Sequence, residues 1–290
     1  MVQNTGNKLN QSVLRQVEKV EYFCNAENIS PNQAVHEFRK SFKRLRALLR
    51  FYEQIPGNEI TPLHENIKEY GKQLSLLRES YLNSELLEKE LRGRKLIPER
   101  KIKLAGEKLH LKNKILIDSF FTERKICKSI SDFFTGFETK LMDAGSNKLA
   151  RIHVVQEVKD TYLNAYNRHQ NIQESEVTAD RLHALRKKLK RLYYQLDFIR
   201  LLHPRYFKVK SEQLNMITDQ LGDDHDLHVF SEELHADEYD FSADELRIIE
   251  NQVAHLRELN QLKLFPRLRQ FFSETPEAFN ERISRALKID

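Results

Sequence analysis

Apolar residues recur every three to four positions through almost the whole chain, and no segment alternates between apolar and polar residues as a half-buried strand would. Turn-forming residues are scarce, since 290 residues include only eight glycines and seven prolines. Charged residues make up 31% of the chain and hydrophobic residues 40%, a balance that suits amphipathic helices with one solvated face. We therefore predict an all-α protein that is long enough to bury a large core.

Capping residues indicate where several of these helices begin. Ser30 before Pro31 predicts a helix that reaches about residue 52, and Thr61 before Pro62 predicts another that reaches about residue 83. Further helices are expected over residues 9–25 and from residues 98, 178, 242 and 275.

The sequence contains an internal repeat with an offset of 147 residues. The segment VHEFRKSFKRL at residues 35–45 aligns with LHALRKKLKRL at residues 182–192, so that one His, two Arg, two Lys and one Leu coincide. The same offset carries residues 74–79 onto residues 221–226. This period is far too long for a solenoid. We infer two similar helical halves that meet near a loop at residues 143–150.

Each copy of the repeated segment predicts a helix with one apolar face and one cationic face. At about 100° per residue, Phe38 and Phe42 fall on the apolar face of the first copy, and Leu185 and Leu189 on that of the second. The opposite faces carry His36, Arg39, Lys40, Lys43, Arg44, Arg46 and Arg50 in the first copy and His183, Arg186, Lys187, Lys190 and Arg191 in the second. Like charges one turn apart repel each other, so an anionic partner is the expected relief.

Two interpretations of these cationic faces stay open at this point. Stacked one turn apart, the side chains could follow a string of phosphates, with Arg as a bidentate donor and Lys as a point charge. The alternative is a solvated surface stripe. His36 and His183 begin the two stripes, and with an ordinary pKa of about 6.5 we expect them to be partly charged near neutral pH.

Charge is also segregated outside the repeated segments, although the net charge is only +5. Residues 89–114 contain ten Lys or Arg and three acids, whereas residues 231–250 contain eight acids and one Arg. The basic tract could extend a binding surface or form an exposed helix. The acidic tract could be a solvated face or a counterweight that keeps polyanions to one side.

Nothing in the sequence identifies a reaction, and we expect a non-enzymatic protein without a cofactor, a metal ion or catalytic residues. No glycine-rich phosphate loop occurs, and no Ser or Cys has the context of a nucleophile. His225 and His228, or Asp224 and His228, could share a helical face as metal ligands. This leaves open a metal-dependent phosphohydrolase that uses His225 and Asp226. The aligned first-half segment offers Arg78 and Glu79 instead of matching ligands. A simpler role for Glu79 or Asp226 is to pair with a cation of its own half.

The remaining features point to a reducing compartment. Cys24 and Cys127 are the only cysteines, too few for a disulfide framework. The N-terminal segment lacks the apolar core of a signal peptide, and no run approaches the roughly 20 apolar residues of a membrane span. We expect a cytoplasmic protein with no membrane partner.

The motifs VHEFRKSFKRLR and LHALRKKLKRLYYQLDFI, each followed some forty residues later by a leucine-led segment that ends in an acid, resemble the signature of the CHAD family, the conserved histidine α-helical domains. The similarity spans roughly residues 8–288. The first half departs from the family pattern, with Ser75 in place of the glycine and Glu79 in place of the aspartate of the second-half segment LGDDHDL. In the second half, Tyr193 stands at the position that matches Arg46.

The resemblance implies one helical domain over residues 8–288, made of two four-helix-bundle-like halves at about 8–143 and 147–288. It also implies a pseudo-two-fold axis between the halves, a basic central cavity that binds inorganic polyphosphate, and association with polyphosphate granules. The residues that match the family's cavity residues are those named above for the two cationic faces, except Arg50. Arg50 is included because it lies on the same cationic face of the first helix. RNA or another nucleic acid is the alternative ligand. Phe38 and Phe42 are expected in the core, away from bases, but Tyr193 and Tyr194 lie nearer the cationic side.

Overall fold

The computed structural model describes residues 2–201, 204–236 and 239–288, and these residues form helices and short connections with no strand. The all-α fold class expected from the sequence is therefore confirmed. The first part of the chain contains α1 (Val2–Asn25), α2 (Pro31–Glu53), α3 (Thr61–Glu90), α4 (Glu99–Ile117), a π-helical segment (Asp118–Glu123), α5 (Ile126–Phe134) and α6 (Phe137–Asp143). A 3₁₀ turn (Ser146–Lys148) leads into α7 (Arg151–Gln173), α8 (Ala179–Arg200), α9 (Pro204–Glu233), α10 (Ala243–Phe271) and α11 (Pro276–Leu287).

Most of the expected caps are present. The hydroxyl of Ser30 accepts a hydrogen bond from the backbone N–H of Gln33, and Thr178 caps α8 in the same way. Ser242 and Thr275 cap α10 and α11. The expected cap at Thr61 is wrong, because Thr61 is already inside α3, which has no side-chain cap.

α3 also continues to Glu90, beyond the expected end near residue 83. Its last turns carry Leu87, which is fully buried in a second hydrophobic core. Packing in that core keeps this segment helical, although no local sequence signal distinguishes it.

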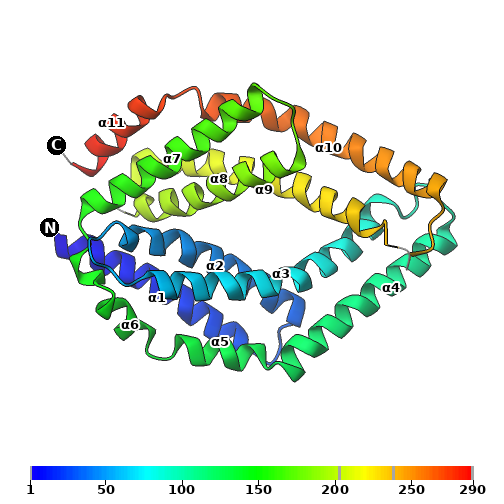
Figure 1. The fold of residues 1–290 in the computed structure, drawn as a ribbon, viewed down its shortest axis with the longest axis horizontal. Helices are drawn as coiled ribbons and strands as arrows, with labels where there is room; N and C mark the ends of the chain where they lie inside the picture. Colours follow the sequence, from blue (N-terminus) through cyan, green and yellow to red (C-terminus); the bar gives the residue numbers. More distant parts are fainter. Residues whose placement is uncertain (1, 202–203, 237–238, 289–290) are drawn as a thin grey trace.

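Figure 1 shows a lens-shaped molecule whose middle is formed by α2, α3, α8 and α9, with both termini at the same end. α2 packs against α3 and α8, and α9 packs against α3 and α8. The outer helices α1 and α4 to α6 lie on the side of α2 and α3, whereas α7 and α10 lie beside α8 and α9 (Figure 1). α11 packs against α7. α1 to α3 have 24, 23 and 30 residues, and α7 to α9 have 23, 22 and 30. The pseudo-two-fold relation between the halves stays a prediction.

The main core contains the expected apolar faces of α2 and α8. Phe38, Phe42, Leu185 and Leu189 are at most 1% exposed, and this core continues across both helices. The second core lies where the ends of α3 and α9 meet α4 and α10, and Phe230 is fully buried there. Because the apolar faces of α2 and α8 are committed to the core, their cationic faces have fixed directions.

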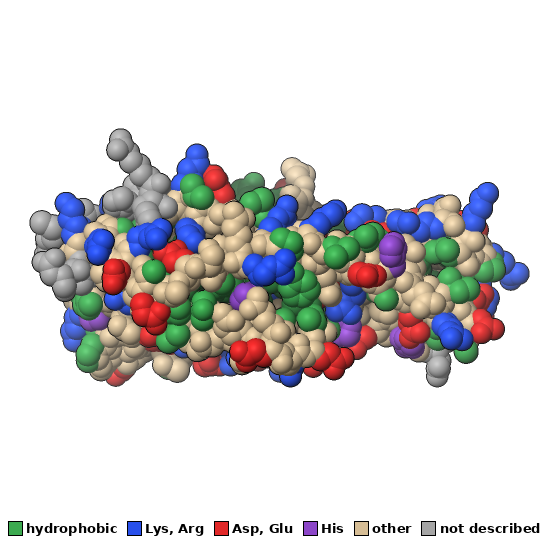
Figure 2. All heavy atoms as spheres, turned by 90° about the horizontal axis from the view of Figure 1, so that it is seen from above, with side chains coloured by type: hydrophobic (Ala, Val, Ile, Leu, Met, Phe, Trp, Pro, Cys, Tyr) green, Lys and Arg blue, Asp and Glu red, His purple; other side chains and the backbone are tan. Residues whose placement is uncertain are grey.

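The basic tract at residues 89–114 lies against the acidic tract at residues 231–250. Lys101 Nζ is 2.6 Å from a carboxylate oxygen of Glu245, and Lys112 Nζ is 2.5 Å from Glu233. Acids and cations also alternate over much of the face seen in Figure 2. The basic tract is therefore partly neutralised by the protein itself, which makes it a weak candidate for an extended binding surface.

Candidate anion-binding site

The cationic faces of α2 and α8 meet between the two parts of the chain. Arg39 and Lys43 of α2 lie in electrostatic range of Arg186 on α8, and Lys43 also faces Lys190. We call these four residues the central cluster. α2 and α8 pack directly on each other, which places side chains about 147 positions apart in the sequence around one site.

Burial and mutual repulsion disfavour the charged forms of the two lysines in the central cluster. Burial and the nearby cations Arg186, Arg39 and Lys190 lower the pKa of Lys43 to about 7. Burial also lowers the pKa of Lys190, and Asp219 acts against this shift. No ion pair joins Lys43 to a carboxylate among the residues that the structure describes. An anion bound here would relieve the repulsion among the four cations.

Two acids lie at the edge of the central cluster, Glu79 on α3 and Asp226 on α9. Burial raises the pKa of both carboxyl groups. Nearby cations lower these pKa values in part, namely Arg39 for Glu79, and Arg186 and Lys43 for Asp226. In the described part of the chain, no ion pair within 4.0 Å joins either acid to these cations. The interaction with a cation of the same half that the sequence suggested is present at longer range, between Glu79 and Arg39 and between Asp226 and Arg186. Asp226 also faces cations of the other half.

The two arginines of the central cluster are positioned differently. Arg39 Nη1 donates to the backbone oxygen of Gly71 at 3.1 Å and to the hydroxyl of Ser75 at 2.5 Å. At the matching place on α9, a Cβ added to Gly222 would lie 3.2 Å from Arg186 Nη2. The first half thus holds its guanidinium with a hydroxyl, whereas the second half makes room for it with a glycine, which explains the departure from the family pattern at Ser75.

The histidines differ from the sequence expectation. Burial and the nearby Lys187 and Arg186 lower the pKa of His183 to about 4. Its ring lies over that of His225, with centroids 4.0 Å apart, and burial lowers the pKa of His225 to about 3. Burial and Arg78 also lower the pKa of His36. The expected partial charge near neutral pH is thus corrected: in the free protein His183 is a neutral ring that stacks on a second one.

The other stripe residues lie around the central cluster rather than in it. His36, Lys40 and Lys187 are exposed. Arg44 is bound to Asp197 of α8 at 2.6 Å. The remaining members Arg46, Arg50 and Arg191 lie within electrostatic range of one another.

Two cations near the site were not assigned from the sequence. Arg78 lies in electrostatic range of His36 and Asp226, and Lys188 lies in range of Arg191. The repeat could have identified Arg78, because it occupies the position that matches His225. No such signal exists for Lys188, which matches the buried Ser41.

The residues proposed as metal ligands have other partners. Asp224 is 1% exposed and accepts hydrogen bonds from Arg257 at 3.1 Å and from Gln261 at 2.7 Å. His228 lies 3.5 Å from Glu232, one turn along α9. Within the described ranges, no three His, Cys, Asp or Glu side chains are grouped so as to hold a metal ion.

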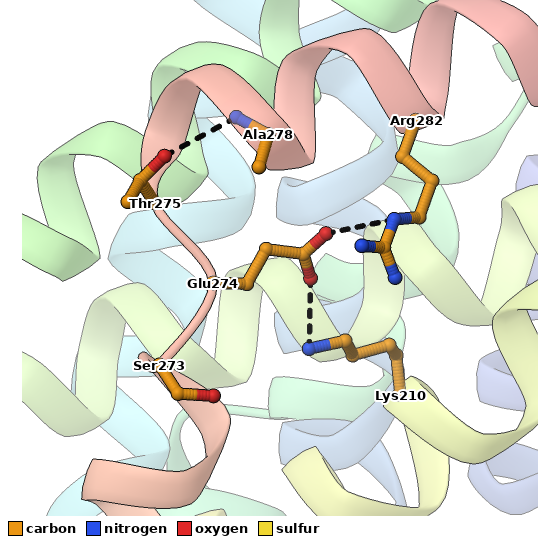
Figure 3. Close-up of a pocket in the computed structure, with 6 residues that line it drawn as sticks. All are labelled: Lys210, Ser273, Glu274, Thr275, Ala278 and Arg282. Atoms are coloured by element: carbon orange, nitrogen blue, oxygen red, sulfur yellow. Dashed lines mark hydrogen bonds and ion pairs between the residues drawn. The ribbon is translucent and has the colours of Figure 1, made fainter.

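A shallow pocket of about 400 Å³ lies beside the start of α11, away from α2. Figure 3 shows Glu274 between two cations there, with its carboxylate 3.0 Å from both Lys210 Nζ and Arg282 Nε. An internal acid already balances these charges, so this pocket is a weaker anion site than the central cluster. The basic central cavity implied by the resemblance stays a prediction.

A family model described as the CHAD domain matches residues 12–235, which is most of the chain. The chain belongs to the CHAD family. This CHAD chain also resembles the crystal structure of the CHAD domain from the plant Ricinus communis, with a TM-score of 0.61, 17% identity, and coverage of 98% of this chain and 91% of that one. At this identity the likeness shows a shared fold. A search of curated proteins finds no match. None of the helices in the described ranges is long and apolar enough to cross a membrane.

Proposed function

We propose that this CHAD protein binds inorganic polyphosphate, without hydrolysing it, at the central cluster. The observation that carries the proposal is that four cations from two packed helices, α2 and α8, meet at one place, where burial and these neighbours lower the pKa of Lys43. The fold holds the four cations of the central cluster close together although they repel one another. A bound anion would offset this repulsion. A string of phosphates provides closely spaced negative charges of the kind that several stacked Arg and Lys side chains bind together.

The aromatic residues near the site favour phosphate over nucleic acid. Tyr194 is only 5% exposed, and its ring lies beneath Arg44 at 5.4 Å. The half-buried Tyr193 is covered by Lys190 at 5.0 Å. Single-stranded nucleic acids gain affinity from bases that stack on open aromatic faces. Here the rings are already occupied by the protein's own cations.

A binding function without catalysis is supported by the other contacts of the candidate catalytic residues. His225 stacks on His183, and Asp226 faces several cations. We expect no phosphate release when the protein is incubated with polyphosphate and a divalent cation. Binding of this kind would also allow association with polyphosphate granules, which co-sedimentation with granules would test.

The decisive experiment removes two charges from one half at a time. Arg39→Ala with Lys43→Ala, and separately Arg186→Ala with Lys190→Ala, should each weaken polyphosphate binding at least tenfold, because each change removes two charge-assisted contacts worth about 1.5 kcal/mol or more apiece. Titration calorimetry gives the affinity, and circular dichroism checks that helicity is kept.

The control is Arg247→Ala with Lys263→Ala, which removes the same charge from exposed positions on α10. This variant should bind within about twofold of the parent protein, because exposed charges contribute little at a distance. Equal losses in the control and in the central-cluster variants would contradict the proposal. In competition at physiological salt, displacement of polyphosphate by an equal charge of RNA would favour the nucleic-acid alternative.

A further inference from the structure

The contact between α2 and α8 has two flanks that the internal repeat makes comparable. The offset of 147 matches Arg44 to Arg191 and Arg50 to Asp197. Positions 44 and 50 lie roughly 120° apart around a helix, so they point to opposite sides of the contact. One flank therefore contains Arg44 of α2 with Asp197 of α8, and the other contains Arg50 of α2 with Arg191 of α8.

The Arg44 flank is neutralised by residues of the protein. Asp197 lies 2.6 Å from Arg44 and 2.8 Å from Arg200, so one carboxylate holds two guanidinium groups. Lys190, which points toward this side, is 3.3 Å from Asp219. A phosphate chain that reached this flank would meet two carboxylates and cations that are already paired.

The Arg191 flank contains Arg46 and Arg50. The repeat matches these two arginines to Tyr193 and Asp197, which lie on the Arg44 flank. Arg191 faces these two arginines, and Lys188 lies beside Arg191. The Nε atoms of Arg46 and Arg50 are buried and have no hydrogen-bond partner among the described atoms.

Two acids, Glu157 and Glu53, lie in electrostatic range of Arg191, and each has hydrogen-bond or ion-pair partners other than Arg191. Glu157 of α7 accepts hydrogen bonds from Gln54 at 3.0 Å and from Gln195 at 2.9 Å, which ties α2, α7 and α8 together. Glu53 pairs with Arg50 and, at 2.8 Å, with the buried His64. These contacts leave Arg46, Arg191 and Lys188 without an ion pair in the described part of the structure.

We propose that a long polyphosphate bound at the central cluster continues over the Arg191 flank and not over the Arg44 flank. This inference rests on the proposed polyphosphate binding. The Arg191 flank supplies Arg46, Arg191 and Lys188, which have no ion pair in the described part of the structure, beside Arg50, which Glu53 already pairs. On the other side, Asp197 and Asp219 repel a chain of phosphates. Charge thus distinguishes two flanks whose positions the sequence repeat matches, and the ligand runs in one direction.

The test compares two positions that the repeat makes equivalent. Arg191→Gln should weaken binding of long-chain polyphosphate by roughly three- to tenfold, as expected for the loss of one partly buried arginine contact. Its affinity for tripolyphosphate should stay within about twofold of that of the parent protein. Arg44→Gln should leave the affinities for both ligands within about twofold of those of the parent protein. The carboxylate of Asp197 is not left unpaired in this variant, because Arg200 remains as its partner. Arg191→Lys, which keeps the charge, should recover most of the long-chain affinity.

Several outcomes would contradict the proposal that the polyphosphate chain continues over the Arg191 flank only. Equal effects of Arg191→Gln and Arg44→Gln would show a chain that uses both flanks or neither. A loss of tripolyphosphate affinity in Arg191→Gln that matched the long-chain loss would place Arg191 in the central site. Failure of the proposed function looks different, because Arg39→Ala with Lys43→Ala would then bind both ligands normally.

Discussion

At the scale of single residues, Lys43 shows how strongly the fold acts on a charge. Its position on α2 is half-buried, and burial together with Arg186, Arg39 and Lys190 lowers its pKa to about 7. Among these neighbours, the carboxylate of Asp226 acts in the opposite direction. A group whose folded pKa is lowered in this way binds fewer protons than in the unfolded chain between about pH 7 and its ordinary value. Lys43 therefore makes the free protein more stable as pH rises through that window.

Polyphosphate binding should reverse this shift. Above pH 7 the free Lys43 is largely neutral, and an adjacent anion favours its charged form. We expect binding at pH 8 to take up close to one proton and the affinity to rise as pH falls from about 9 to 7. Calorimetry in two buffers with different ionisation enthalpies measures the uptake.

Lys43→Arg provides the control for this proton, because a guanidinium group stays charged throughout the range. This variant should bind polyphosphate with little proton uptake at pH 8. An unchanged uptake would assign the proton to another group, such as His183, whose pKa in the free protein is about 4.

At the scale of helices, one small residue on α9 leaves room for an arginine side chain of α8. Gly222 is buried on α9, and Arg186 of α8 lies against it. Any side chain at this position would press on the guanidinium group. Gly71 on α3 has open space around the position of an added Cβ, although it is also a helical glycine.

Gly222→Ala should weaken polyphosphate binding several-fold, because the added methyl group displaces Arg186 from a cluster where four cations act together. Gly71→Ala is the matched control, because it adds a methyl group in open space and keeps the backbone oxygen that accepts a hydrogen bond from Arg39. It should raise the free energy of unfolding by up to about 1 kcal/mol and leave the affinity for polyphosphate unchanged. Thermal unfolding and calorimetry on both variants give the two quantities. Equal affinities for the two variants would show that Arg186 has room to move.

The helix boundaries show what local sequence signals can and cannot predict. Ser30, Thr178, Ser242 and Thr275 mark helix starts because their hydroxyl groups satisfy free N–H groups within the same few residues. The start of α7 has no such residue. There the ring nitrogen Nδ1 of His153 accepts a hydrogen bond from the backbone N–H of Ala150 at 3.1 Å, an arrangement that residue preferences do not reveal.

At the scale of the whole molecule, the proposed binding site depends on how the two parts of the chain meet. α2 packs on α8 and α3 packs on α9, so cations from both parts can contact one ligand. Once one half has bound a phosphate chain, binding to the other half is intramolecular. The effective concentration of the second contact then adds to the affinity.

A long polyphosphate should therefore bind more tightly per phosphate than tripolyphosphate, and with one chain per protein. Its affinity should also fall more steeply with salt, since more cations are neutralised. Calorimetry gives the stoichiometry, and a series of salt concentrations gives the slope. Two independent sites with equal affinity per phosphate would contradict a site shared by both halves.

The sequence by itself determined the all-α class, the apolar and cationic faces of α2 and α8, and most helix starts, because helical periodicity and capping act over a few residues. Only the tertiary structure decided which cations share an environment. It placed Lys43 opposite Arg186, bound Arg44 to Asp197, and brought the basic and acidic tracts together. The physical reason is that burial and Coulomb energies depend on distances between helices, which residue spacing along one helix does not contain.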